Sequence, residues 1–147
     1  MLSLCAPSSP EKTPRLWVVP GKPVPWARTR GTGARRYTSP RYRAWSALAK
    51  QVIGLRPQGR PITEPQQLEV TVVRPRPKRL REGGRCCAPT RPDLDNYIKG
   101  VLDALQGAGV LKDDALVVEV HARKVYAASG ADPQVEVALI PHQHTPP

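Results

Sequence analysis

The sequence predicts a single α/β (α+β) domain in which a mixed β-sheet packs with two main helices. Residues 41–54 and 94–106 have the apolar spacing of helices, and the segments around them have the alternation or β-branched content of strands. The chain has 147 residues, which is enough for one domain with a core of its own. We expect this domain to span residues 15–141, between a disordered leader at 1–14 and a disordered tail at 142–147.

The first half of the chain predicts a strand, a helix and a second strand. Residues 16–19 form a short apolar strand, which the proline-rich segment 20–25 ends because proline cannot donate to a sheet. The helix at 41–54 places on one side Tyr42, Trp45, Leu48, Ala49 and Ile53. Residues 68–73 alternate apolar and polar side chains as a strand does, and they lead into a basic loop.

The second half predicts the clearer helix and two more strands. The helix at 94–106 has an apolar stripe formed by Leu94, Ile98, Val101, Leu102 and Leu105. Gly107 supplies a C-terminal stop for this helix. Residues 116–125 and 134–140 are rich in β-branched residues and predict strands. The order of the strands in the sheet is left open.

The charge of the chain is strongly divided. The formal net charge is +11, which divides into +15 for residues 1–92 and −4 for residues 93–147. Such a basic chain is expected to bind nucleic acid, and it has no apolar run near the roughly 20 residues that a membrane helix needs. Three cysteines, two of them adjacent, suggest neither a disulfide framework nor a zinc site. We therefore expect a cytoplasmic nucleic-acid-binding protein with no membrane partner and no small-molecule cofactor.

Five of the six aspartates lie between residues 93 and 114. Asp93 and Asp95 are two residues apart at the start of the second helix, so on extended backbone their carboxylates project to the same side and could hold Mg²⁺. Lys99 follows one helical turn later and can lean over the site. A glycine-rich turn then precedes Asp113 and Asp114, and we expect it to return the chain toward the helix start, so that one of the two completes the metal site.

Each of these residues also has a structural explanation. An aspartate at a helix N-terminus is a common cap, and Asp95 with Lys99 is a common surface pair. Asp103 is expected to make only a solvated ion pair with Lys99, and Asp113-Asp114 could form a turn. The strongly basic flanking region favours the metal site.

The same residues resemble a known family. The run Arg91-Pro92-Asp93-Leu94-Asp95-Asn96 through Lys99, then Asp103-Ala104-Leu105 and Asp113-Asp114-Ala115, resembles the signature of RusA-type Holliday junction resolvases. The resemblance implies a RusA-like fold and a homodimeric endonuclease that nicks four-way DNA junctions with Mg²⁺, or with Mn²⁺ in its place. It implies that Asp93, Asp95 and Asp114 are the catalytic, metal-binding aspartates and that Lys99 is the essential lysine.

Two basic loops are the candidate DNA-binding segments. We expect phosphate contacts from Arg28, Arg30, Arg35, Arg36, Arg74, Arg76, Lys78 and Arg79. Trp26 or Tyr37 would stack on an unpaired base, although a solvated loop explains the first segment equally well. His121 and Lys124 in the strand, and His142 and His144 in the tail, are given little functional weight.

The sequence thus predicts a structure-selective DNA endonuclease that resolves four-way junctions in recombination and repair. Two alternatives remain open. One is a non-catalytic basic module that binds branched nucleic acid, and the other is a different metal-dependent nuclease acting on flaps, single strands or RNA.

Overall fold

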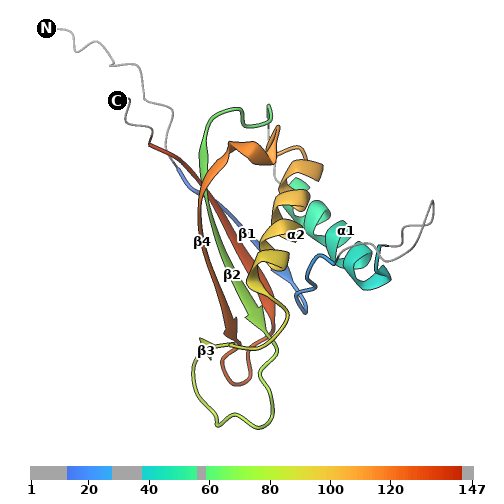
Figure 1. Ribbon diagram of the computed structural model, residues 1–147, viewed down its shortest axis with the longest axis vertical. Coiled ribbons are helices and arrows are strands. Elements are labelled where there is room, and N and C mark those ends of the chain that lie inside the picture. The colour runs from blue at the N-terminus through green and yellow to red at the C-terminus, as the bar shows by residue number, and fades with distance from the viewer. Residues whose placement is uncertain (1–12, 28–37, 56–58, 144–147) are drawn as a thin grey trace, which may run out of the picture.

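Five strands and two long helices make up the computed structural model, which describes residues 13–27, 38–55 and 59–143 (Figure 1). In chain order the elements are β1 (Arg15–Pro20), α1 (Pro40–Gly54), β2 (Gln66–Arg74), β3 (Cys86–Cys87), α2 (Leu94–Gly107), the 3₁₀-helix η1 (Asp114–Leu116), β4 (Val117–Tyr126) and β5 (Gln134–Pro141). Both helices and all four strands expected from the sequence are present.

The strands form one mixed sheet in the order β1-β5-β2-β4-β3. β2 and β4 run parallel, whereas the other neighbours are antiparallel. Parallel neighbours cannot be joined by a tight hairpin, and α2 supplies the crossover between β2 and β4. The predicted α+β domain with a mixed sheet and two helices is therefore confirmed.

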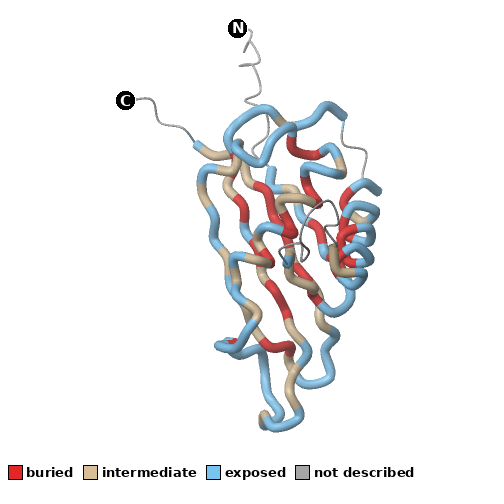
Figure 2. The backbone as a smooth tube through the Cα atoms, turned by 45° about the vertical axis from the view of Figure 1, so that its right-hand side comes forward, coloured by how far each residue is buried: buried red, intermediate tan, exposed pale blue. Residues whose placement is uncertain are grey.

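Both helices pack on the same face of this sheet (Figure 2). Alternate strand residues point toward them, such as Leu68 and Val70 of β2 and Val137 of β5, and all three are almost fully buried. Trp45 of α1 and Val101 of α2 meet them from the helix layer. The alternation in the strands and the 3.6-residue spacing in the helices thus build one core.

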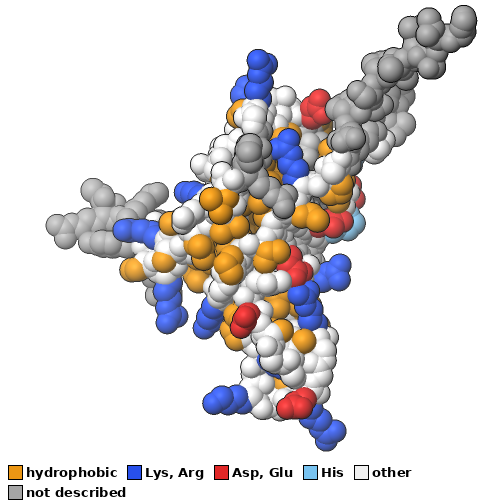
Figure 3. All heavy atoms as spheres, turned by 180° about the vertical axis from the view of Figure 1, so that it is seen from behind, with side chains coloured by type: hydrophobic (Ala, Val, Ile, Leu, Met, Phe, Trp, Pro, Cys, Tyr) orange, Lys and Arg blue, Asp and Glu red, His pale blue; other side chains and the backbone are white. Residues whose placement is uncertain are grey.

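The other face of the sheet has no helix over it in the described part of the chain. Leu16 and Val18 of β1 are exposed on that face. A separate gathering of hydrophobic side chains, with lysines and arginines projecting around it, is visible from behind the view of Figure 1 (Figure 3).

The outer edge of β4 is also open over most of its length. β3 pairs with β4 only through Cys86 with Tyr126 and Cys87 with Val125. Val118 and Val120 lie along the open part and are 57% and 42% exposed. An exposed strand edge presents unpaired backbone groups and can pair with another chain.

Some local features differ from the expectations. β3 and η1 are too short to show a sequence period, and neither was predicted. His142 was expected in a disordered tail, but its backbone N–H donates to Pro65 at 3.0 Å. The leader at 1–12 and the tail at 144–147 lie outside the described residues. Within the described ranges, no helix combines the length and the apolar character that crossing a membrane requires.

Candidate metal centre and nucleic-acid interface

The start of α2 displays two carboxylates. Asp93 immediately precedes the helix in an extended conformation, with φ −70° and ψ 145°, and its side chain makes no capping hydrogen bond. Asp95 lies in the first turn, and its Oδ1 accepts from the backbone N–H of the adjacent Asn96 at 3.0 Å. Both residues are exposed. Capping therefore does not explain Asp93, and its carboxylate is available to a ligand.

Lys99 lies on the same helix but does not pair with a carboxylate. Its Nζ sits 3.6 Å from the centroid of the Trp26 ring, which is a cation–π contact. Neither Asp95 nor Asp103 forms an ion pair with it among the described side chains. The expected pair between Lys99 and Asp103 is therefore wrong. Trp26 holds the ammonium near the start of α2.

Asp103 instead accepts a hydrogen bond from the hydroxyl of Tyr42 at 3.2 Å, which ties α2 to α1. Burial, together with the Asp103 carboxylate, raises the pKa of Tyr42 to about 12. Asp103 therefore has a structural role, but its partner is Tyr42 and not the expected Lys99.

The two adjacent aspartates before β4 differ in role. The Oδ1 of Asp113 accepts from the backbone N–H of Ala115 at 2.9 Å and caps η1. This hydrogen bond holds the pKa of Asp113 below its usual range. Asp114 is exposed at the start of η1. Asp113 therefore caps η1, whereas the Asp114 side chain does not.

Asp114 lies far from Asp93 and Asp95 in the same chain. Residues 93 and 114 flank opposite ends of α2 (Figure 1), and its 14 residues span about 20 Å at about 1.5 Å per residue. The expectation that the glycine-rich turn returns Asp113 and Asp114 to the helix start is therefore wrong within one chain. The chain runs back toward that end only along β4, after Asp114. Accordingly, no three His, Cys, Asp or Glu side chains among the described residues come together to hold a metal ion.

Lys124 is the residue that reaches the start of α2 from β4. Its Nζ donates to the carbonyl of Pro92 at 2.6 Å and also to the carbonyl of Thr90. Pro92 directly precedes Asp93, so this ammonium fixes the backbone that carries the first carboxylate. Lys124 was expected to carry little functional weight, although a lysine on the core-facing side of a strand was a signal for such a role.

Replacing Lys124 with Met should loosen the entry to α2. Two charge-assisted hydrogen bonds to carbonyls are lost, and we expect a stability loss of about 2 kcal/mol. Mg²⁺ binding at the predicted site should also weaken, because Asp93 is no longer held in place. Thermal unfolding and a Mg²⁺ titration would measure both effects, with the exposed Lys112→Met as the control. Unchanged Mg²⁺ binding would show that Lys124 supports the fold alone.

Two of the predicted phosphate ligands are used inside the protein. The Nη1 of Arg74 donates to Thr90 Oγ1 at 2.8 Å, and this hydroxyl also bonds the Tyr126 hydroxyl. The guanidinium of Arg76 donates to the carbonyls of Arg81, Gly84 and Ala127. Arg74 and Arg76 therefore organise the loop between β2 and β3.

The other predicted cations of this loop face outward. Lys78 and Arg79 are exposed at its turn, and both remain predicted phosphate contacts. The loop is also tied to β5, because Arg85 forms a 2.6 Å ion pair with Glu136. The remaining candidates, Arg28, Arg30, Arg35 and Arg36 with Tyr37, lie outside the described residues.

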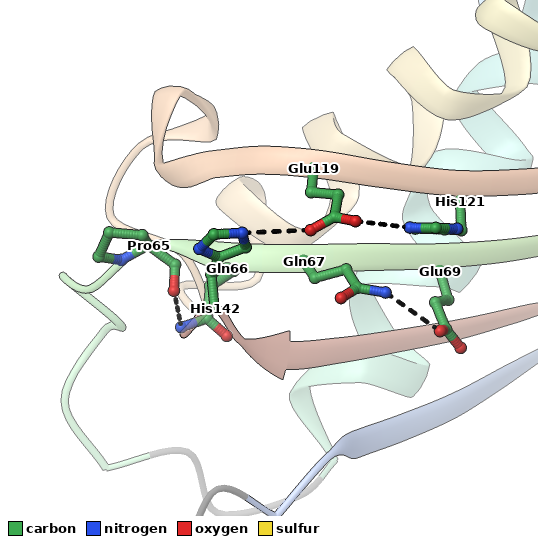
Figure 4. A network of polar contacts seen from close by, with 7 residues as sticks. All are labelled: Pro65, Gln66, Gln67, Glu69, Glu119, His121 and His142. Atoms are coloured by element: carbon green, nitrogen blue, oxygen red, sulfur yellow. Dashed lines mark hydrogen bonds and ion pairs between the residues drawn. The ribbon is translucent and has the colours of Figure 1, made fainter. Parts of the chain in front are cut away.

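A second polar cluster occupies the opposite, uncovered face of the sheet (Figure 4). Glu119 lies between two imidazoles, with His121 Nε2 at 2.7 Å and His142 Nε2 at 3.1 Å from its carboxylate oxygens. These contacts, mainly the hydrogen bond from His121, hold the pKa of Glu119 below its usual range. The imidazoles are engaged by Glu119, so the cluster is a surface tie between β4 and the end of β5.

Comparisons with known proteins agree with the motif. The family model for endodeoxyribonuclease RusA matches residues 20–140. The uncharacterized protein YqaN of Bacillus subtilis (strain 168) is 37% identical over 136 residues, covering 84% of this chain and 93% of its own. The crossover junction endodeoxyribonuclease RusA of Aquifex aeolicus (strain VF5) is 30% identical over 95 residues, covering 65% of this chain and 66% of its own. On the match to residues 20–140, this chain belongs to the RusA family of endodeoxyribonucleases.

Proposed function

We propose that this protein is a Mg²⁺-dependent, structure-selective DNA endonuclease that resolves four-way junctions by paired nicks as a homodimer. The observation that carries the proposal is the exposed carboxylate pair of Asp93 and Asp95, of which Asp93 is not used as a cap. Lys99 lies one turn further along the same helix. These residues lie within the family match to residues 20–140.

The residues present suit a divalent metal and a phosphate. Carboxylate oxygens are the ligands that Mg²⁺ prefers, and a bound Mg²⁺ would polarise the scissile phosphate and lower the pKa of a water. In this proposal Asp93, Asp95 and Asp114 hold the ion, with Mn²⁺ as a substitute. Lys99 would place a positive charge beside the phosphate, where it offsets charge that develops during cleavage.

A homodimer accounts for the distance between Asp114 and the other two aspartates. One chain offers Asp93 and Asp95 at one end of α2 and Asp114 at the other, so neither end has a full set of ligands. A two-fold axis that reverses the direction of one chain relative to the other would place Asp114 of each copy beside Asp93 of its partner. Two such sites, related by symmetry, match the two symmetric cuts that a four-way junction requires.

The open edge of β4 is the surface that fits such a dimer. Val117 lies beside η1, and Lys124 contacts the backbone before Asp93. The two are seven residues apart in β4, or about 23 Å at about 3.3 Å per residue. Antiparallel pairing of β4 with its copy, centred on Val120, sets Val117 of one strand opposite Arg123 of the other, next to Lys124. Asp114 then approaches the partner's α2.

The first test is cleavage of a labelled four-way junction beside a matched linear duplex, with Mg²⁺ or with EDTA. We expect paired nicks confined to the junction in Mg²⁺. The Asp95→Asn variant should lose at least about 100-fold in rate, because even outer partners of metal ligands are worth 10- to 100-fold. It should keep its junction affinity, since removing a negative charge does not weaken phosphate binding.

Other outcomes would separate the alternatives. Tight junction binding with no cleavage under any metal condition would favour a non-catalytic binding module. Cleavage of flaps, single strands or RNA in preference to the junction would support a metal-dependent nuclease but would assign it a different substrate.

A further inference from the structure

A cavity of about 570 Å³ lies between the loop that follows β1, the first turns of α1 and the start of α2. Its walls are mostly apolar and include Pro23 from the loop, with Ala44 and Leu48 from α1. Ala44 is exposed and Leu48 is 37% exposed, so the apolar wall is open to a ligand. A cavity of this size and character suits a small, mainly apolar group.

Cations stand around this apolar wall. Lys22, Arg41 and Arg74 line the cavity, and no acidic residue is among its described lining residues. Lys22 and Arg41 are exposed. By contrast, the two cavities over the sheet surface are lined by glutamate Glu69. An apolar wall with a positive rim is the chemistry that a nucleotide requires, because its base has apolar faces and its phosphate is an anion.

The cavity adjoins the candidate metal centre. Pro92, which directly precedes Asp93, forms part of its wall. Tyr97 lines it as well, and this residue lies on α2 between Asp95 and Lys99. When a DNA strand binds with its scissile phosphate at Asp93 and Asp95, the neighbouring nucleotide therefore lies at the mouth of the cavity.

We propose that this cavity receives one unstacked nucleotide next to the scissile phosphate of branched DNA. The inference rests on the proposed nuclease function and adds a binding site to it. The base packs against Ala44, Leu48 and the loop prolines, and its phosphate contacts Arg41 and Lys22. Withdrawing a base from a stack is cheapest where pairing and stacking are already interrupted, as at a strand exchange point. The site therefore favours branched DNA over a continuous duplex.

The first test fills the cavity by Ala44→Phe, with Ala47→Phe as the matched control. Ala47 is also exposed on α1 but does not line the cavity. The substrate is a four-way junction with 2-aminopurine at the nucleotides that flank the cleavage position, bound in EDTA. With the wild-type protein and with Ala47→Phe, we expect its fluorescence to rise as the base leaves the stack. Ala44→Phe should lack this rise and should cleave the junction about 10-fold more slowly in Mg²⁺.

A second pair of variants tests the rim without changing the volume of the cavity. Arg41→Gln should reduce the slope of log affinity against log salt by about 0.9, the contribution of one phosphate contact. Arg43→Gln, exposed on α1 and outside the cavity lining, should leave the slope unchanged. This pair decides the question if Ala44→Phe does not fold, which circular dichroism would show.

The two proposals fail in different ways. If the wild-type protein cleaves junctions, but each cavity variant behaves like its control, the nucleotide site is overturned and the nuclease function stands. If the wild-type protein neither binds nor cleaves branched DNA, both proposals fail.

Discussion

Coexpressed Asp95→Asn and Asp114→Asn chains should yield dimers that nick four-way junctions, although neither variant is active alone. In the proposed dimer each site takes Asp93 and Asp95 from one chain and Asp114 from the other. A heterodimer of the two variants then has one site with both defects and one intact site. With random pairing, about a quarter of the wild-type number of sites should survive. A cleavage assay at equal total protein would measure this recovery.

The form of the product adds a second readout. A heterodimer with one intact site should cut one strand, so the junction is nicked but not resolved into two duplexes. Coexpressed Asp93→Asn and Asp95→Asn chains are the matched control, because both defects fall on the same side of the site and no intact site forms. Equal inactivity of the two mixtures would mean that Asp114 does not act across the dimer.

The elements of the fold could largely be predicted because their apolar periods are local. The stripe that includes Leu94, Val101 and Leu105 marks α2, and the structure buries Val101 and Leu105 fully. The alternation of residues 68–73 likewise marks β2. A two-residue strand such as β3 has no period to detect, and its pairing depends on how the preceding loop is held.

The roles of the charged residues were harder to predict, because a sequence shows charge but not what surrounds it. Arg76 has the character of a phosphate ligand, yet three backbone carbonyls of its own neighbourhood enclose its guanidinium. Lys124 lies 32 residues from the carbonyl of Pro92 along the chain, and only the folding of the loop onto β4 brings them together.

The candidate site, too, could be predicted from the sequence only in part. The spacing of Asp93 and Asp95 places both at one helix start, and this part of the prediction depends on a single local element. The position of Asp114 depends on the direction and length of α2, which carries the chain away from Asp93 before the turn that leads to Asp114. The sequence motif therefore identifies the carboxylates but not the number of chains needed to assemble them.

Replacing Val120 with Lys should convert the proposed dimer into monomers and remove Mg²⁺-dependent cleavage. Val120 lies near the centre of the open β4 edge and is 42% exposed, so a lysine there can be solvated in a single chain. In a two-fold pairing its ammonium would meet that of the partner, and a charge on a strand edge blocks such pairing. Sedimentation would show the mass, and cleavage should fall at least about 100-fold if the ligand set is broken.

Val18→Lys is the matched control, because Val18 is a valine of similar exposure, 48%, on β1 at the other side of the sheet. It should leave both mass and cleavage unchanged. A Val120→Lys protein that remains dimeric and active would exclude the β4 edge as the interface, and a monomeric Val18→Lys protein would point to β1 and the uncovered sheet face. Val120 is four residues from Lys124, about 13 Å along the strand, and touches none of the three aspartates directly. A joint loss of dimer and cleavage would therefore arise from assembly of the site rather than from damage to its parts.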